Sequence, residues 1–257
     1  MMKFIILSLE VKSTETRSPR NFMPYRHEQF VNGEIYHTVI RGIDDNLIFK
    51  NTDDYYRGIF SIYEFNTTMP IEIRLQREKR YTVKKHGDRV SEDTRDKLVE
   101  IFCFYFMPNH LHLLLRQLKN GGITQFMKKL GVGYGGYFNR KYNRRGYVFQ
   151  NRFRAVHIKT NEQLKNVFVY IHTNGISLIE PKWKEKGVSN PKKVIKFLEN
   201  YKWSSYPDYI GKKNFPSVTN RDFLLKVMGG KKGCKEFVEN WVKYKGGIKD
   251  FGEIILE

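Results

Sequence analysis

Two histidines lie one residue apart inside an apolar run of the sequence. The stretch FMPNHLHLLLRQ, residues 106–117, places His110 and His112 on either side of Leu111. In a β-strand, side chains two positions apart point to the same face of the sheet, so both imidazoles would project together from a buried strand. Such a pair has three uses: metal ligation, acid–base chemistry, or burial as polar members of the core.

A metal site at this histidine pair needs further ligands. A catalytic metal takes about three protein ligands and keeps positions open for substrate. The chain has two cysteines, Cys103 and Cys234, whose number and positions exclude a thiolate site. The third ligand would be Asn, Gln, Asp, Glu or another His. Such oxygen and nitrogen ligands suit Mg²⁺ or Mn²⁺ on a phosphate, although histidine also admits Zn²⁺.

A later segment, residues 160–175, offers chemical partners on a predicted helix that ends at Gly175. Tyr170 and Asn174 are four residues apart and therefore share one helix face. They lie at the border of the apolar stripe, where a tyrosine can expose its hydroxyl while its ring is packed. The alternative is an ordinary boundary tyrosine followed by a C-terminal asparagine.

The elements that would position these residues are predicted from periodicity and turn chemistry. Strands are predicted at 34–43, 101–107, 111–117 and around 147–159. Helices are predicted at 52–66, at 91–100 with Ser91 as cap, at 121–143 with glycine interruptions and Thr124 as a candidate cap, at 160–175 with Thr160 or Asn161 as cap, and within 191–245. Pro108 and Asn109 favour a turn, so the two middle strands should form an antiparallel hairpin. The order predicts an α+β fold, with helices on one face of an antiparallel sheet and the other face partly open.

The charge of the chain indicates a polyanionic partner. The net charge is +19, and residues 101–160 contain eleven Lys or Arg and no Asp or Glu. Aromatic residues are interleaved with these bases, and together they suit phosphates and unpaired bases. The predicted DNA-binding residues are Lys128, Lys129, Arg140, Lys141, Arg144, Arg145, Arg152 and Arg154. The alternative is a solvated basic surface.

Composition also restricts the class of protein. With 40% hydrophobic and 15% aromatic residues, the chain can bury a large core. Its two cysteines fit a reducing cytosol, and the early apolar run at 4–9 is too short for a signal core or a membrane span. We therefore expect a cytoplasmic protein.

Several motifs, taken in order, resemble one family. They are YHTVIRG, MPNHLHLLL, YFNRKYNRRGYVFQNRF, YIHTNG and WSSYPDYIG. From about Met23 to residue 245 the chain resembles the REP-associated tyrosine transposases, single-tyrosine members of the HUH (His-hydrophobic-His) group. The resemblance implies a ferredoxin-like HUH domain at 23–180, an N-terminal tail at 1–22 and a mainly helical extension at 181–257.

The resemblance also implies a role for each matching residue. His110 and His112 match the HUH metal ligands, Asn174 matches the third ligand and Tyr170 matches the nucleophile. The implied cofactor is Mg²⁺ or Mn²⁺. The family pattern usually has Asn-Pro where this chain has Asn174-Gly175, a departure that bears on the turn after the ligand. His157 and His172 are candidate general bases, although packing or solvent exposure would explain each of them.

The implied reaction is cleavage and rejoining of single-stranded DNA near hairpins through a 5′-phosphotyrosine bond. We expect a DNA hairpin as partner, with no membrane and no small-molecule substrate. A monomer is expected because the C-terminal region could cover the surface of a dimer, but a homodimer stays open. Two other classes also stay open. A non-cleaving DNA- or RNA-hairpin-binding protein would need none of the four site residues, and a metal-dependent phosphodiesterase using water would tolerate Tyr170→Phe.

Overall fold

A computed structural model describes residues 29–72, 75–76, 78, 93, 95–150 and 152–244 of the chain. The predicted N-terminal tail, residues 1–22, lies outside this described part. Within it, every helix is too short or too polar to cross a membrane.

The centre of the fold is a four-stranded antiparallel sheet. Its strands are β1 (Ile35–Arg41), β2 (Val99–Met107), β3 (His110–Gln117) and β4 (Arg154–Ile158), in the spatial order β2-β3-β1-β4. The predicted hairpin is confirmed, because β2 and β3 pair on either side of Pro108 and Asn109. The predicted α+β class is therefore confirmed.

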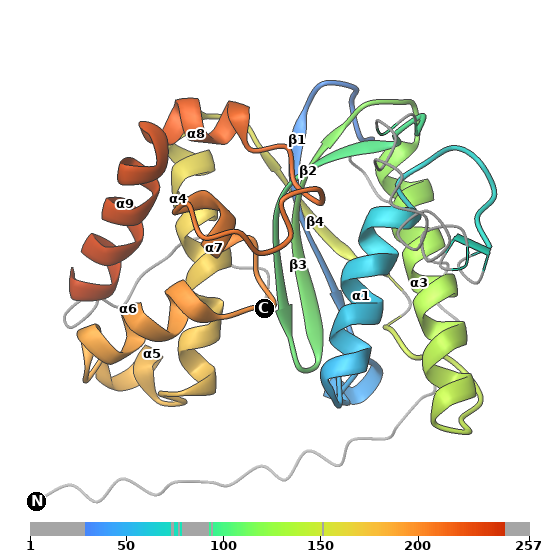
Figure 1. Cartoon of the computed structure of the whole chain (residues 1–257), viewed down its shortest axis with the longest axis horizontal. Coiled ribbons are helices and arrows are strands. Elements are labelled where there is room, and N and C mark those ends of the chain that lie inside the picture. The colour runs from blue at the N-terminus through green and yellow to red at the C-terminus, as the bar shows by residue number, and fades with distance from the viewer. Residues whose placement is uncertain are drawn as a thin grey trace, which may run out of the picture.

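Helices cover both faces of the sheet, as Figure 1 shows. Helices α1 (Thr52–Glu64) and α3 (Gly122–Lys141) lie on one face, while α4 (Asn161–Thr173) and the C-terminal helices lie on the other. The prediction of a partly open face was wrong. The reason lies in β2 and β3, whose consecutive side chains are almost all buried, and the apolar ones point to both faces, so both faces of these strands require a covering layer.

The C-terminal region packs in one core with α4 and closes an edge of the sheet. Its elements are η2 (Asn174–Leu178), α5 (Trp183–Lys186), α6 (Pro191–Asn200), α7 (Tyr206–Tyr209), α8 (Asp222–Met228) and α9 (Gly230–Tyr244). The other short 3₁₀ turn, η1 (Ile43–Asp45), follows β1. Residues 203–205 pair with β2: the Phe106 amide donates to the Trp203 carbonyl at 2.9 Å, and the Ser205 amide donates to the Phe104 carbonyl at 3.0 Å. This short segment satisfies edge groups that would otherwise be free to pair with another strand.

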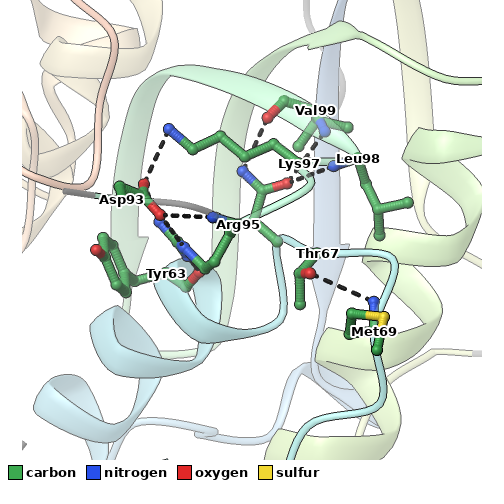
Figure 2. Close-up of polar contacts among 9 residues, drawn as sticks. Tyr63, Thr67, Met69, Asp93, Arg95, Lys97, Leu98 and Val99 are labelled. Atoms are coloured by element: carbon green, nitrogen blue, oxygen red, sulfur yellow. Dashed lines mark hydrogen bonds and ion pairs between the residues drawn. The ribbon is translucent and has the colours of Figure 1, made fainter. Parts of the chain in front are cut away.

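The predicted helix at 91–100 is wrong in the part that the structure describes. Residues 99–100 begin β2, and residues 95–98 are not helical. Figure 2 shows the reason: the Asp93 carboxylate accepts hydrogen bonds from Arg95 at 2.7 Å and forms an ion pair with Lys97 at 2.9 Å, while the Arg95 guanidinium covers the Tyr63 ring. These contacts hold an extended loop against the end of α1. Ser91 lies outside the described residues.

Helix α3 is also continuous where the sequence predicted glycine interruptions. Its N-cap is Gly121 in the left-handed region, with φ of 68°, so Thr124 is not the cap. Gly133 lies against Phe65, whose ring atom would be 2.1 Å from a Cβ at this position. A glycine that costs helix propensity here allows close packing against the end of α1.

Helix α4 begins as predicted but ends earlier. Thr160 is the N-cap and forms a capping box with Gln163, whose backbone N–H donates to Thr160 Oγ1 at 3.1 Å. The α-helix ends at Thr173, and Asn174 continues the chain into the 3₁₀ turn η2. Gly175 therefore lies inside a second helical segment and is not the stop residue.

Gly175 is required by a tyrosine of the sheet. A Cβ at Gly175 would lie 1.7 Å from Tyr105 Oη and 2.8 Å from Tyr105 Cζ. Proline also carries a Cβ, so a proline at position 175 would meet the buried Tyr105 of β2 in the same way.

The substitution Gly175→Ala should lower the free energy of unfolding by about 1–3 kcal/mol, because a methyl group would overpack the site. Urea denaturation measures the change. Gly136→Ala on α3 is the matched control, since its Cβ would meet only Arg140 Nη1 at 3.5 Å. This control should stabilise the helix by up to about 1 kcal/mol. An unchanged unfolding midpoint for Gly175→Ala would contradict the close packing.

Candidate active site

The two histidines of β3 point to the sheet face that α4 covers. His110 pairs with Arg41 of β1 and Met107 of β2, and His112 pairs with Val39 and Tyr105. Their ring centroids are 4.8 Å apart. His112 is almost completely buried, whereas His110 lies at the strand end and keeps slight exposure. The strand thus aims both imidazoles together, as the alternation of the sequence predicted.

The ring nitrogens of the pair have matching environments. His110 Nδ1 lies 2.7 Å from Asn109 Oδ1, and His112 Nδ1 lies 3.0 Å from His37 Nε2 of β1. No hydrogen bond within the described residues reaches Nε2 of either histidine, and His112 Nε2 is fully buried. A ring nitrogen without a hydrogen bond, on an imidazole whose other nitrogen is held by a polar group, suits coordination of a cation.

Tyr170 is brought to these histidines from α4. Its ring centroid lies 5.7 Å from those of both His37 and His112, edge-on in each case. The side chain is 7% exposed, because the helix face that carries it packs against the sheet. A tyrosine 58 residues beyond His112 in the sequence therefore lies beside it in space.

Asn174 lies one helical turn beyond Tyr170 and is half-buried. Its Nδ2 donates to the Tyr170 carbonyl at 3.2 Å, and no hydrogen bond joins it to His110 or His112 in the described part of the chain. Among the same residues, no cluster of three or more His, Cys, Asp or Glu could hold a metal ion. The role of Asn174 as a ligand stays a prediction.

Both histidines are neutral at neutral pH. Burial, together with the positive charge of Arg41, lowers the pKa of His110 to about 3, against an opposing effect of Asp45. Burial and the neighbouring histidines hold the pKa of His112 well below its ordinary value, with Arg41 and Lys184 acting in the same direction. Neutral imidazole is the form that binds a cation.

Three features of this site were missed in the sequence: His37, Arg41 and Lys184. His37 and Arg41 lie four positions apart on β1, so they share the face of His110 and His112, and that spacing was a usable signal. Lys184 lies on the short α5, and its positive charge lowers the pKa of both histidines, an influence that no local pattern indicates. Arg41 forms an ion pair with Asp45 at 3.0 Å, and Arg41 and Lys184 place positive charge near the histidines, which suits a phosphate.

The two candidate general bases lie elsewhere. His172 is fully buried on another face of α4, 2.9 Å from Ser205 Oγ. His157 stacks on Tyr36 on the opposite face of the sheet and lies 2.9 Å from Glu34 Oε2. His172 is thus packed in the core and His157 lies in a surface pair with Glu34, the alternatives to a role as general base.

The eight predicted DNA-binding residues do not form a single patch. Lys129 donates to the carbonyls of Thr67 and Met69, and Lys141 forms a 2.7 Å ion pair with the buried carboxylate of Asp54. These two lysines stabilise the α1–α3 layer. The remaining six are Lys128 and Arg140 on α3, Arg144 and Arg145 after it, and Arg152 and Arg154 at or before β4.

Arg154 is the predicted residue that the sheet places nearest to the histidines. It pairs with Val39, which pairs with His112, so the three residues form one row on the same face. Since neighbouring strands lie about 4.8 Å apart, Arg154 begins about 10 Å from His112. Arg152 instead lines a groove of about 730 Å³ between α3 and residues 146–153, on the other face. Tyr147, at 81% exposure, also lines that groove.

The sheet brings the histidine pair and the tyrosine of α4 into one site, and comparison with known families relates this part of the chain to DNA-processing enzymes. Residues 72–174 match the family described as "Transposase IS200 like". This match agrees with the resemblance to the tyrosine transposases over residues 72–174. The matched stretch contains His110, His112, Tyr170 and Asn174.

Solved structures give more distant likenesses. The chain is similar to a REP-associated tyrosine transposase bound to a REP hairpin, with 14% identity over 78% of this chain and 93% of that chain, and a TM-score of 0.39. It is also similar to a bacterial tRNA(His) guanylyltransferase-like protein in complex with GTP, with 10% identity over 60% and 70% of the two chains and a TM-score of 0.35. These likenesses are too distant to assign a substrate. No curated protein matches the chain.

Proposed function

We propose that this protein cleaves and rejoins single-stranded DNA near hairpins through a covalent bond between Tyr170 and a 5′-phosphate. The observation that carries the proposal is the position of Tyr170, whose ring lies beside His112 on the face of the sheet that presents the histidine pair. The match of residues 72–174 to the IS200-like transposase family supports a strand-transfer reaction.

The chemistry of Tyr170 accounts for both cleavage and rejoining. Its Oη attacks the scissile phosphorus, the bond to the 3′-oxygen breaks, and a 5′-phosphotyrosine and a 3′-hydroxyl result. The phenolic proton leaves, and the departing 3′-oxygen gains a proton. Because the phosphotyrosine remains a phosphodiester, a 3′-hydroxyl can attack it in reverse and restore the DNA strand without another energy source.

His110 and His112 would hold a divalent cation through Nε2, with Asn174 as the proposed third ligand. Mg²⁺ or Mn²⁺ bound there would supply electrophilic activation of the phosphate. The neutral state of both histidines and the buried Nε2 of His112 support this assignment. Arg41 and Lys184 would add positive charge beside the phosphate, and the walls of the site would exclude bulk water.

A labelled single-stranded hairpin DNA, incubated with the protein and Mg²⁺ or Mn²⁺, tests the proposal on a denaturing gel. The expected product is a protein–DNA adduct that survives detergent, together with a free 3′-hydroxyl fragment. Cleavage without an adduct would indicate a phosphodiesterase that uses water. A shift on a native gel without cleavage would indicate a binding protein. Either result would overturn the proposal.

Arg154→Ala should weaken binding of single-stranded DNA and lower the slope of log affinity against log salt by about 0.7, the value for one lost phosphate contact. Fluorescence anisotropy at several salt concentrations measures both quantities. Lys165→Ala is a control with the same loss of charge, since Lys165 of α4 lies over the ring of Phe237 of α9. Equal slopes for the two variants would show that Arg154 makes no phosphate contact.

A further inference from the structure

A third buried histidine adjoins the HUH pair. His37 lies in the middle of β1 with 0% exposure. It is opposite Leu114, while His112 is opposite Val39, so the two histidines are diagonal neighbours on one face of the sheet. Their rings are nearly parallel, with an interplanar angle of 14° and centroids 5.2 Å apart.

One proton must lie between the two rings. His37 Nε2 and His112 Nδ1 are 3.0 Å apart, a distance at which one nitrogen donates and the other accepts. If His37 donates, neutral His112 carries its own proton on Nε2 and cannot bind a cation. If His112 donates from Nδ1, its Nε2 keeps a lone pair directed away from His37.

The neighbouring histidine favours the second arrangement. Asn109 Oδ1 is an acceptor, so His110 Nδ1 must donate to it across 2.7 Å, which leaves a lone pair on His110 Nε2. Each histidine of the pair then has its Nδ1 held by a polar partner and its Nε2 directed to a shared space. Nothing among the described residues bonds His112 Nε2 or His37 Nδ1, although both atoms are fully buried.

We infer that His37 is a positioning residue that accepts the Nδ1 proton of His112 and so fixes the orientation and tautomer in which His112 Nε2 binds the cation. The inference rests on the proposed function for its cation. The contact also restrains Tyr170, because the Tyr170 ring lies edge-on to both His37 and His112. His37 thus links the ligand strand to the helix that carries the nucleophile.

The tautomer of His112 can be measured in the cation-free protein. Protein labelled with ¹⁵N-histidine should show, by NMR, a proton on Nδ1 of His112 and none on Nε2. The His112 resonances are assigned by their loss in His112→Gln. In His37→Leu, which fills similar space without an acceptor, this tautomer should no longer dominate. A proton on His112 Nε2 in the wild type would overturn the inference.

Cation affinity is the second readout. His37→Leu should lower Mn²⁺ affinity about 10- to 100-fold by calorimetric titration, as for loss of other groups that orient a ligand. His37→Gln, whose side-chain oxygen can replace Nε2, should recover most of it. His157→Gln, on the opposite face, is the matched control and should bind as the wild type does. Thermal unfolding verifies that each variant is folded.

The two readouts separate the two claims. Wild-type affinity in a folded His37→Leu variant would overturn the inference about His37. A wild-type protein that binds no Mn²⁺ would count against the proposed cation site, while the predicted His112 tautomer, present in the wild type and lost in His37→Leu, would still support the role of His37.

Discussion

Tyr170→Phe should form no covalent DNA adduct, and cleavage of single-stranded hairpin DNA should fall on the order of 10⁴-fold or more, as when other covalent nucleophiles are removed. Phenylalanine keeps the ring that contacts His37 and His112 and removes only Oη. The fold, the Mn²⁺ affinity and the affinity for DNA should therefore stay close to those of the wild type. Quantitative denaturing gels measure cleavage and adduct formation, and fluorescence anisotropy measures the affinity for DNA.

Tyr147→Phe is the matched control for this substitution. Tyr147 is the most exposed large hydrophobic side chain of the described residues, at 81%. It is therefore the alternative tyrosine nucleophile that DNA could reach most easily. Its loss should leave adduct formation intact. An adduct that persists in Tyr170→Phe and disappears in Tyr147→Phe would show that the nucleophile was wrongly assigned.

His110→Ala is expected to have the second-largest effect. Loss of one ligand of the cation should lower cleavage roughly 10²- to 10³-fold, because the charge that develops on the phosphate would be less well stabilised. His110 lies at the strand end and keeps slight exposure, so the substitution should disturb the core less than one at the fully enclosed His112. Single-turnover cleavage at several Mn²⁺ concentrations and calorimetric titration measure the loss.

A histidine outside the site provides the control for His110→Ala. His157→Ala removes an imidazole that pairs with Glu34 on the other face of the sheet, and it should cleave at the wild-type rate. If His110→Ala also cleaved at the wild-type rate, the histidine pair would have a packing role and the cation site would be wrong.

Local patterns were enough to predict the elements that carry the chemistry. The hairpin of β2 and β3 follows from two apolar runs around Pro108 and Asn109, and the start of α4 follows from the Thr160 capping box. Alternation within β3 placed His110 and His112 on one face. The residues that make up each of these signals lie close together in the chain, so the signals can be recognised without knowledge of the fold.

Contacts between distant segments were the part that could not be predicted. His37 meets His112 across 75 positions, and Lys141 neutralises Asp54 across 87. The spacing of His37 and Arg41 indicates a shared strand face, but no local pattern indicates which histidine His37 contacts or that one lysine of the basic window is structural. The end of α4 was misplaced for a similar reason. Gly175 suggested a stop signal, but it is small because Tyr105 of another element occupies the space beside it.

The most direct test of the central claim is to identify the residue that bears the DNA. Wild-type adduct, treated with nuclease and trypsin, should yield the peptide of residues 166–182 with a nucleotide remnant, and Tyr170 is the one tyrosine in that peptide. Fragmentation in a mass spectrometer should place the remnant on Tyr170. A remnant on the peptide of residues 146–152, which contains Tyr147, or the absence of any remnant from an active preparation, would contradict the account.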